Sequence, residues 1–282
     1  MTEQQFRTWL KDPRRRPLVM GVLNVTPDSF SDGGLFASAA AAIERAQALC
    51  DEGAHIIDIG GESSRPGAPR ISAAQQINRI LPVFEAIKGR LPCVLSVDTT
   101  RAEVARTALE NGATIVNDIS AGLDDPALLS LAGKRNTPLI LMHMCGQPAD
   151  MQRDPHYEDV TAEVSRFLAQ RLSAAVAAGV AAENVMLDPG IGFGKTTEHN
   201  LQLLRDLPRL RELGRPLVVG TSRKRFIGAI TGDAEPSQRI MGTAASVAWC
   251  VANGTDVVRV HDVGAMAKVV RMIEAIRSAS VP

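Results

Sequence analysis

The chain has 282 residues, of which 45% are hydrophobic, and its 31 lysines and arginines balance 31 aspartates and glutamates. This composition suffices for a sizeable core, and a neutral chain without a basic block has no electrostatic reason to bind nucleic acid or an anionic membrane. No apolar run approaches the roughly 20 residues that a transmembrane helix needs, so we expect a globular, non-membrane protein.

Residues 1–16 precede the first apolar run, and we interpret them as a short N-terminal arm. This segment lacks the apolar stretch of a secretory signal, which favours a cytoplasmic protein. The four cysteines, Cys50, Cys93, Cys145 and Cys250, are scattered without the spacing of a metal site. We therefore expect all four to be reduced thiols, most of them packed in the core.

Short runs rich in Val, Ile and Leu recur through the rest of the chain, and each is followed by a segment with helical periodicity. The runs cover residues 17–25, 54–61, 93–99, 113–120, 138–144, 184–190, 216–222 and 256–262. They are apolar almost throughout rather than alternating, which is typical of buried parallel strands. Gly53, Gly112 and Gly254 each stand just before a strand, as expected of glycines that end helices.

Eight β-then-α units in about 250 residues predict an α/β fold, a single (β/α)8 TIM barrel. A doubly wound open sheet is the alternative. The count of eight and the lack of a linker or a break in composition favour the barrel. We assign it to residues 17–282 as one domain that follows the short N-terminal extension.

Polar residues gather at the carboxyl ends of the predicted strands. They are Asn24, Glu62, Ser64, Arg65, Asp98, Asn117, Asp118, His143, Asp188, Ser222, Arg223, Lys224, Arg225, Arg259 and His261. In a barrel these ends converge on the face where active sites are built. An unpaired buried polar group costs roughly 1–3 kcal/mol, so a ring of them indicates function. We interpret Asp58 and Asp118 instead as carboxylates satisfied within the core, with Asp58 accepting local backbone hydrogen bonds.

The ring contains two kinds of chemistry. Asp98, Asn117 and Asp188 supply oxygen acceptors and an amide, which suit a ligand with adjacent N–H donors such as a pterin or purine edge. The second group, Lys224, Arg259 and His261, is cationic or able to become so, and it follows strands seven and eight, where this fold often binds an anion. We therefore expect a polar heterocycle at one end of the site and an anion at the other.

Two weaker patterns are set aside. The stretch GIGFGKT is similar to a phosphate-binding loop, but that motif requires glycine where Pro189 stands. Its glycines indicate a close backbone approach instead. His143 and Cys145 are too few ligands for a metal site, and no Ser-His-Asp set is recognisable.

The chain resembles the dihydropteroate synthase family over essentially its whole length. The matching motifs are GVLNVTPDSFSDGG, IIDIGGESSRPGA, SVDTTRAEVA, IVNDISAG, LMHM, LDPGIGFGK, SRKRFIG and RVHDV. The resemblance implies a TIM-barrel transferase of folate biosynthesis, which transfers an alkyl group other than methyl. Such an enzyme condenses 6-hydroxymethyl-7,8-dihydropterin diphosphate with 4-aminobenzoate to give 7,8-dihydropteroate and diphosphate. The resemblance further implies Mg²⁺ as cofactor, inhibition by sulfonamides and a homodimer.

The family's site residues are carried over position by position. The pterin pocket would contain Asp98, Asn117, Asp188 and Lys224. The diphosphate would meet Asn24, Arg65, Arg259 and His261, with Asn24 also near Mg²⁺. The aminobenzoate would lie by Ser64, Pro66, Phe193 and Arg225, and Ser222 completes the substrate-binding set. Catalytic roles would fall to Asp98 and Lys224, and to Asp28 and Asp32 on a mobile first loop that closes over the diphosphate.

The implied reaction is dissociative. Diphosphate leaves once Mg²⁺ and cations neutralise it, the methylene cation is delocalised into the pterin, and the aromatic amine attacks. No covalent enzyme intermediate is expected. The chain departs from the family pattern at Ser64, where threonine is frequent, and at Arg225, where some members have serine. Both changes bear on aminobenzoate contacts and sulfonamide sensitivity.

Two other functions are alternatives for such a chain. A methyltetrahydrofolate-binding module, as in methyltransferases, would share the barrel and the Asp/Asn set, but it would not need the DSFSDGG, SSRPG and SRK motifs that this chain has. An inactive paralogue should have lost the anion-binding residues, yet Arg65, Lys224, Arg259 and His261 are all present. A homodimer could pack through MGTAASVAWCVA, although core burial explains that stretch equally well.

Overall fold

The computed structural model describes residues 1–26, 34–63, 67–146 and 151–279. Within these residues, eight parallel strands form one sheet in the order β6-β5-β4-β3-β2-β1-β8-β7. A bridge between Leu187 and Leu217 joins β6 to the segment leading into β7. The TIM barrel predicted from the eight apolar runs is therefore confirmed. The strands are β1 (Leu18–Asn24), β2 (Ile56–Gly60), β3 (Val94–Asp98), β4 (Ile115–Asp118), β5 (Leu139–Met142), β6 (Val185–Asp188), β7 (Val218–Val219) and β8 (Val257–Val260).

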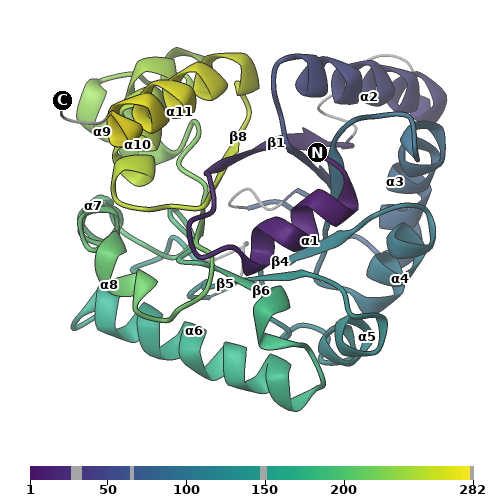
Figure 1. The fold of residues 1–282 in the computed structure, drawn as a ribbon, viewed down its shortest axis with the longest axis horizontal. Helices are drawn as coiled ribbons and strands as arrows, with labels where there is room; N and C mark the ends of the chain where they lie inside the picture. Colours follow the sequence, from purple (N-terminus) through teal and green to yellow (C-terminus); the bar gives the residue numbers. More distant parts are fainter. Residues whose placement is uncertain (27–33, 64–66, 147–150, 280–282) are drawn as a thin grey trace.

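Helices ring the strands (Figure 1). They are α2 (Gly34–Asp51), α3 (Ala73–Ile87), α4 (Ala102–Glu110), α5 (Ala127–Arg135), α6 (Val160–Ala177), α7 (Thr197–Arg205), α8 (Leu207–Arg211), α9 (Arg225–Thr231), α10 (Ile240–Ala252) and α11 (Val263–Ser278). Their apolar faces pack on the outward side chains of the strands in one large core. No helix in the described part of the chain is long and apolar enough to cross a bilayer.

Glycines end three of these helices as predicted. Gly53, Gly112 and Gly254 have φ values of 105°, 103° and 87°. A residue with a Cβ rarely adopts this conformation, so glycine there allows the chain to leave α2, α4 or α10 and turn into the next strand.

The N-terminal segment closes one end of the barrel. Helix α1 (Glu3–Lys11) starts at a capping box formed by Thr2 and Gln5. Its buried face, Phe6, Trp9 and Leu10, packs on inward-facing residues near the amino ends of the strands, and α1 lies across the middle of the barrel in Figure 1. Residues 1–16 thus cover the amino-terminal face, and the carboxyl-terminal face is left for the site.

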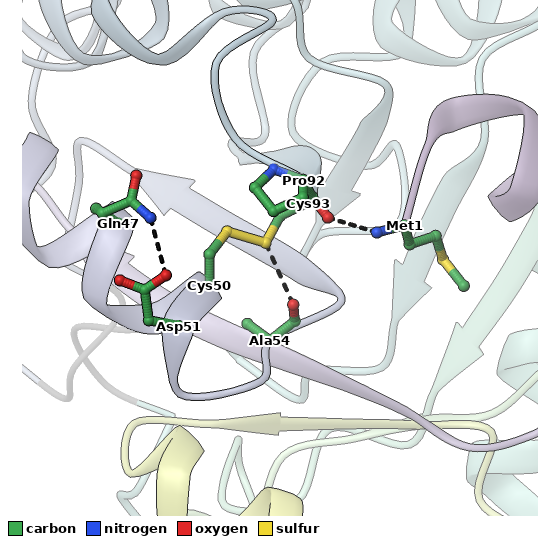
Figure 2. Close-up of a disulfide and its surroundings, with 7 residues drawn as sticks. All are labelled: Met1, Gln47, Cys50, Asp51, Ala54, Pro92 and Cys93. Carbon is green, nitrogen blue, oxygen red and sulfur yellow. Dashed lines mark hydrogen bonds between the residues drawn. A yellow bond between two sulfur atoms is a disulfide. The ribbon is translucent and has the colours of Figure 1, made fainter.

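The expectation for the cysteines was wrong for one pair. Cys50, near the end of α2, and Cys93, just before β3, form a disulfide with a Cα–Cα distance of 6.3 Å (Figure 2). The two are 43 residues apart in the chain, and only the packing of consecutive βα units brings them together. Cys145 and Cys250 are free thiols, as predicted.

Candidate active site

The predicted polar side chains meet at the carboxyl ends of the strands. Asp98 ends β3 and stands in register with Asn117 of β4. Asp188 ends β6, Arg259 lies in β8, and Lys224 follows β7. Parallel strands place these ends at one face of the barrel, opposite α1. The structure therefore brings Asp98, Asn117, Asp188 and Arg259 together from four different strands.

A buried ion-pair network lies at the base of this face. The Arg259 guanidinium donates from Nε to Asp58 Oδ2 at 2.7 Å and from Nη2 to Asp98 Oδ2 at 2.8 Å. Asp58 also accepts hydrogen bonds from Ser96 Oγ at 2.6 Å and Asn117 Nδ2 at 2.9 Å. One fully buried carboxylate thus orients both the amide of Asn117 and the cation of Arg259.

The prediction that Asp58 accepts local backbone hydrogen bonds was therefore wrong. Its three donors are side chains from β3, β4 and β8 rather than nearby backbone groups. The available signal was a carboxylate in the middle of an apolar strand. That signal does not say which neighbouring strands would supply donors.

Asp118, by contrast, matches its prediction. Its carboxylate accepts hydrogen bonds from the backbone N–H and hydroxyl of Ser120 at 2.8 and 2.7 Å, and from the Gly122 N–H at 2.6 Å. These donors all lie within four residues. Asp118 therefore shapes the turn after β4.

The two site carboxyls hold protons more tightly than carboxyls in water. Burial raises the pKa of Asp98 to about 7, against the opposing effect of Arg259. Burial likewise raises the pKa of Asp188 to about 6, although the Gly190 N–H donates to its Oδ1 at 2.7 Å. Both groups gain from a ligand that offers N–H donors, because such a ligand stabilises the ionised carboxylate.

Lys224 faces the aromatic ring of Phe193. Its Nζ lies 4.0 Å from the ring centroid, within cation–π range. Burial lowers the pKa of Lys224 to about 8. The preceding Arg223 adopts the left-handed conformation, with φ of 60°, and its guanidinium is bound by Asp262 at 2.6 and 3.0 Å. This turn, which the sequence analysis missed, sets where the chain places Lys224.

The other predicted residues fall around this centre. Ser222 is buried, and its Oγ lies 3.0 Å from His261 Nδ1 and accepts the His261 N–H at 3.1 Å, so it positions that imidazole. Asn24 ends β1 and is half-buried, and Arg225 is exposed at the start of α9. The predictions for Asp28, Asp32, Ser64, Arg65 and Pro66 lie outside the described residues.

The charge expected at His261 needs correction. Burial lowers the pKa of its imidazole to about 3, and Arg259, Arg223 and Lys224 lower it further. The ring is therefore neutral near pH 7. The neutral ring can offer a hydrogen bond to an anion, and the positive charge of the site comes from Lys224 and Arg259.

Lys195 and His143 form a buried pair beside the site. Lys195 Nζ lies 2.9 Å from His143 Nδ1 and donates to the carbonyls of Gly190 and Phe193, each at 2.9 Å. Lys195 was not among the predicted site residues. A lysine in a glycine-rich loop directly after a site strand was the available signal. Among the described residues, no three His, Cys, Asp or Glu side chains converge to hold a metal.

The raised pKa of Asp188 predicts a specific pH dependence of stability. Between its ordinary pKa of 3.8 and about 6, the folded state keeps a proton that the unfolded chain has released. The stability contributed by this group is full below pH 4 and is lost as the pH rises through 6. As the pH rises across that window, the unfolding free energy of the wild type should fall by about 3 kcal/mol more than that of Asp188→Asn.

Urea unfolding at stepped pH values measures this difference. Asp51→Asn, on the exposed end of α2, should follow the wild-type curve and serves as the control. Parallel curves for the wild type and Asp188→Asn would contradict the shift at Asp188.

Comparison with known proteins agrees with this geometry. Residues 20–261 match the model of the family described as pterin binding enzyme. A dihydropteroate synthase from Synechocystis is 48% identical over 267 residues, which are 95% of this chain and 92% of the relative.

Two solved structures are similar over the same length. Dihydropteroate synthase from Xanthomonas albilineans with 4-aminobenzoic acid has a TM-score of 0.89 and 44% identity, covering 94% of both chains. The Yersinia pestis enzyme in complex with a sulfonamide drug has a TM-score of 0.88 and 44% identity, covering 94% of this chain and 95% of that one.

Proposed function

Since the chain belongs to the dihydropteroate synthase family of pterin-binding enzymes, we propose that the site at the carboxyl face of the barrel carries out that family's reaction, with the roles given below. The chain is a transferase of folate biosynthesis. It condenses 6-hydroxymethyl-7,8-dihydropterin diphosphate with 4-aminobenzoate to form 7,8-dihydropteroate and diphosphate. The observation that carries the assignment of roles is the meeting of Asp98, Asn117 and Asp188 around the Arg259 network.

The pterin binds at the carboxylate end of the site. Asp188 accepts hydrogen bonds from the amino group and adjacent ring N–H of the heterocycle, and Lys224 donates to its carbonyl side. Asn117 and Asp98 meet the remaining polar edge. The raised pKa values of Asp98 and Asp188 support this arrangement, because an N–H-rich ligand adds donors that favour the ionised carboxylates.

The diphosphate binds towards β1 and β8. Two of the five N–H donors of Arg259 are engaged by Asp58 and Asp98, which leaves three donors and the positive charge for the diphosphate. His261 donates from its neutral imidazole, and its pKa rises when the anion arrives. Ser222 keeps that ring in place. Arg65 completes the set.

The residues at this end fit an Mg²⁺ ion that would bind together with the diphosphate. The described residues there provide one amide oxygen, from Asn24, and no carboxylate cluster. A cation held by one protein ligand and substrate phosphate oxygens is the usual arrangement for Mg²⁺. When bound, the metal neutralises charge on the leaving diphosphate. Asp28 and Asp32 are proposed to act from the first loop.

Bond breaking precedes bond making in the proposed mechanism. The C–O bond to diphosphate breaks, and positive charge develops at the methylene carbon and spreads into the pterin ring. The ionised carboxylates of Asp98 and Asp188 stabilise that charge, and hydrogen bonds from Arg259 and the Gly190 N–H already hold them in place. The amine of 4-aminobenzoate, lying near Phe193, then forms the C–N bond and releases its proton to solvent.

A homodimer is proposed through α10 and α11. Ile240, Met241 and Trp249 of α10 and Met272 and Ile276 of α11 are exposed, with Met241 at 77% and Met272 at 61% of their full surface. The two helices pack together, and exposed apolar side chains gathered on neighbouring helices are of the kind that marks interfaces. Light scattering tests the dimer, and Met241→Glu should produce monomers.

We also propose a cytoplasmic location. Disulfides are uncommon in reducing compartments, so the state of the Cys50–Cys93 pair in freshly lysed cells bears directly on it.

The decisive test of the function is diphosphate release by the purified protein with the dihydropterin diphosphate, Mg²⁺ and 4-aminobenzoate. Release that depends on both substrates, and inhibition by a sulfonamide competitive with 4-aminobenzoate, supports the synthase. Pterin binding without turnover would favour a methyltetrahydrofolate-binding module or an inactive paralogue instead.

A further inference from the structure

Lys195 is a buried amine within the loop that follows β6. Its side chain is only 3% exposed. Its Nζ has three partners at 2.9 Å: Nδ1 of His143, at the end of β5, and the carbonyl oxygens of Gly190 and Phe193. A lysine so deeply buried is rare unless its polar head is fully engaged, and here the head joins the end of one strand to the loop of the next.

This cluster is satisfied in either protonation state. An ammonium donates three hydrogen bonds, to both carbonyls and to a neutral His143. A neutral amine donates two to the carbonyls and accepts one from His143 Nδ1–H. Burial lowers the pKa of Lys195 to about 7 and that of His143 to about 3, so the connection persists across the neutral range.

The loop held by Lys195 carries Phe193. Other peptides of this loop are anchored from outside it, the Gly192 carbonyl by Gln152 Nε2 at 2.7 Å and the Gly194 carbonyl by the Tyr157 hydroxyl at 2.8 Å. The carbonyl of Phe193 itself accepts from Lys195. The Phe193 ring in turn lies against the Lys224 ammonium at 4.0 Å.

The loop after β6 approaches the end of β5 so closely that two of its positions leave no room for a side chain. A Cβ on Gly190 would come within 1.8 Å of the His143 carbonyl oxygen, and a Cβ on Gly194 within 2.2 Å of the Cys145 carbonyl oxygen. The loop therefore lies directly against the end of β5. Lys195 is the buried amine that links this loop to His143, in addition to the anchors from Gln152 and Tyr157.

We propose that Lys195 is a positioning residue for the second substrate: it fixes the backbone of Phe193 against His143, and so holds the aromatic wall of the 4-aminobenzoate site and its contact with Lys224. The inference rests on the proposed function. Asp98 and Asn117 meet the pterin from β3 and β4, whereas Asp188 is linked to this loop through Gly190. We therefore expect a larger effect on 4-aminobenzoate than on the pterin.

The test is the steady-state kinetics of Lys195→Met, which keeps the length of the side chain and removes the polar head. The KM for 4-aminobenzoate should rise about tenfold, while the KM for the dihydropterin diphosphate and kcat change less than about threefold. A purely structural role would lower the active fraction, and hence the apparent kcat, without moving that KM. Unchanged KM values in an active enzyme would overturn the proposal.

Thr161→Val is the matched control. It removes a partly buried hydrogen bond, from Thr161 Oγ1 of α6 to Asp206 Oδ2 between α7 and α8 at 2.9 Å, and it should reduce thermal stability without altering either KM. If the wild type shows no turnover, the proposed function fails. If the wild type is active and Lys195→Met behaves like Thr161→Val, only the positioning role fails.

A second pair of variants keeps the proposal testable if Lys195→Met does not fold. His143→Phe preserves the aromatic packing against Phe167 but removes the partner of Lys195, and it should raise the KM for 4-aminobenzoate. His143→Gln retains an acceptor and should restore most of the affinity. Equal KM values in these two variants would contradict the proposed connection.

Discussion

Lys224→Met should lower kcat/KM by about 10²- to 10³-fold while leaving the protein folded. The ammonium lies against Phe193, and its positive charge interacts with both Asp188 and Asp98. Removing it deletes a charge-assisted contact to the pterin. Methionine keeps the length of the side chain, so the loss reflects charge rather than volume.

The same substitution should not reduce thermal stability. The pKa of Lys224 falls from 10.5 to about 8 because burial disfavours the ammonium. When folding lowers the pKa of a base, its contribution to stability is full above the pKa of the unfolded chain. That contribution is lost as the pH falls through 8. At pH 7 the charged, buried lysine therefore destabilises the folded state, and its role is in activity.

Diphosphate release and thermal unfolding, measured on the same preparations, test both expectations. Lys268→Met, on the exposed face of α11, controls for loss of a lysine elsewhere. Activity that falls only in proportion to the unfolded fraction would contradict a direct role for Lys224.

Arg259→Met should destabilise the protein by about 3–5 kcal/mol at pH 8 and abolish turnover. The variant leaves Asp58 and Asp98 buried without the cation that pairs with both. Arg259 also opposes the rise in the pKa of Asp98, so its loss raises that pKa above about 7. The stability deficit should therefore shrink towards pH 5, where Asp98 is protonated, and grow as the pH rises.

Urea unfolding at pH 5 and pH 8 measures this deficit. The double variant Arg259→Met/Asp58→Asn removes one of the two unpaired buried carboxylates. In a double-mutant cycle it should recover part of the lost unfolding free energy. Arg223→Met breaks a more exposed ion pair, with 37% of the arginine side chain accessible, and should cost about 1 kcal/mol or less. Equal losses in the two arginine variants would contradict the special status of the Arg259 network.

Much of the site followed from the residues alone. Each strand contributes an apolar run that ends in a polar side chain, and the barrel rule places such ends together. Asp98, Asn117, Asp188, Lys224 and Arg259 were found in this way, and the structure brings them to one face of the barrel. The same pattern could not separate Asp58 from Asp118, because both are single carboxylates in apolar strands.

The sequence by itself determined the eight βα units, the glycines that end the helices, the family and the identity of most candidate site residues. These depend on periodicity, on local backbone preference and on short motifs, all of which are readable along the chain.

Only the tertiary structure decided which groups touch. It gave Asp58 three donors from neighbouring strands, made His261 neutral by burial among cations, paired Cys50 with Cys93, and engaged Lys195 between two strand ends. Hydrogen-bond partners and pKa shifts depend on distances across the barrel and on exclusion of water, and residues far apart in the chain set both.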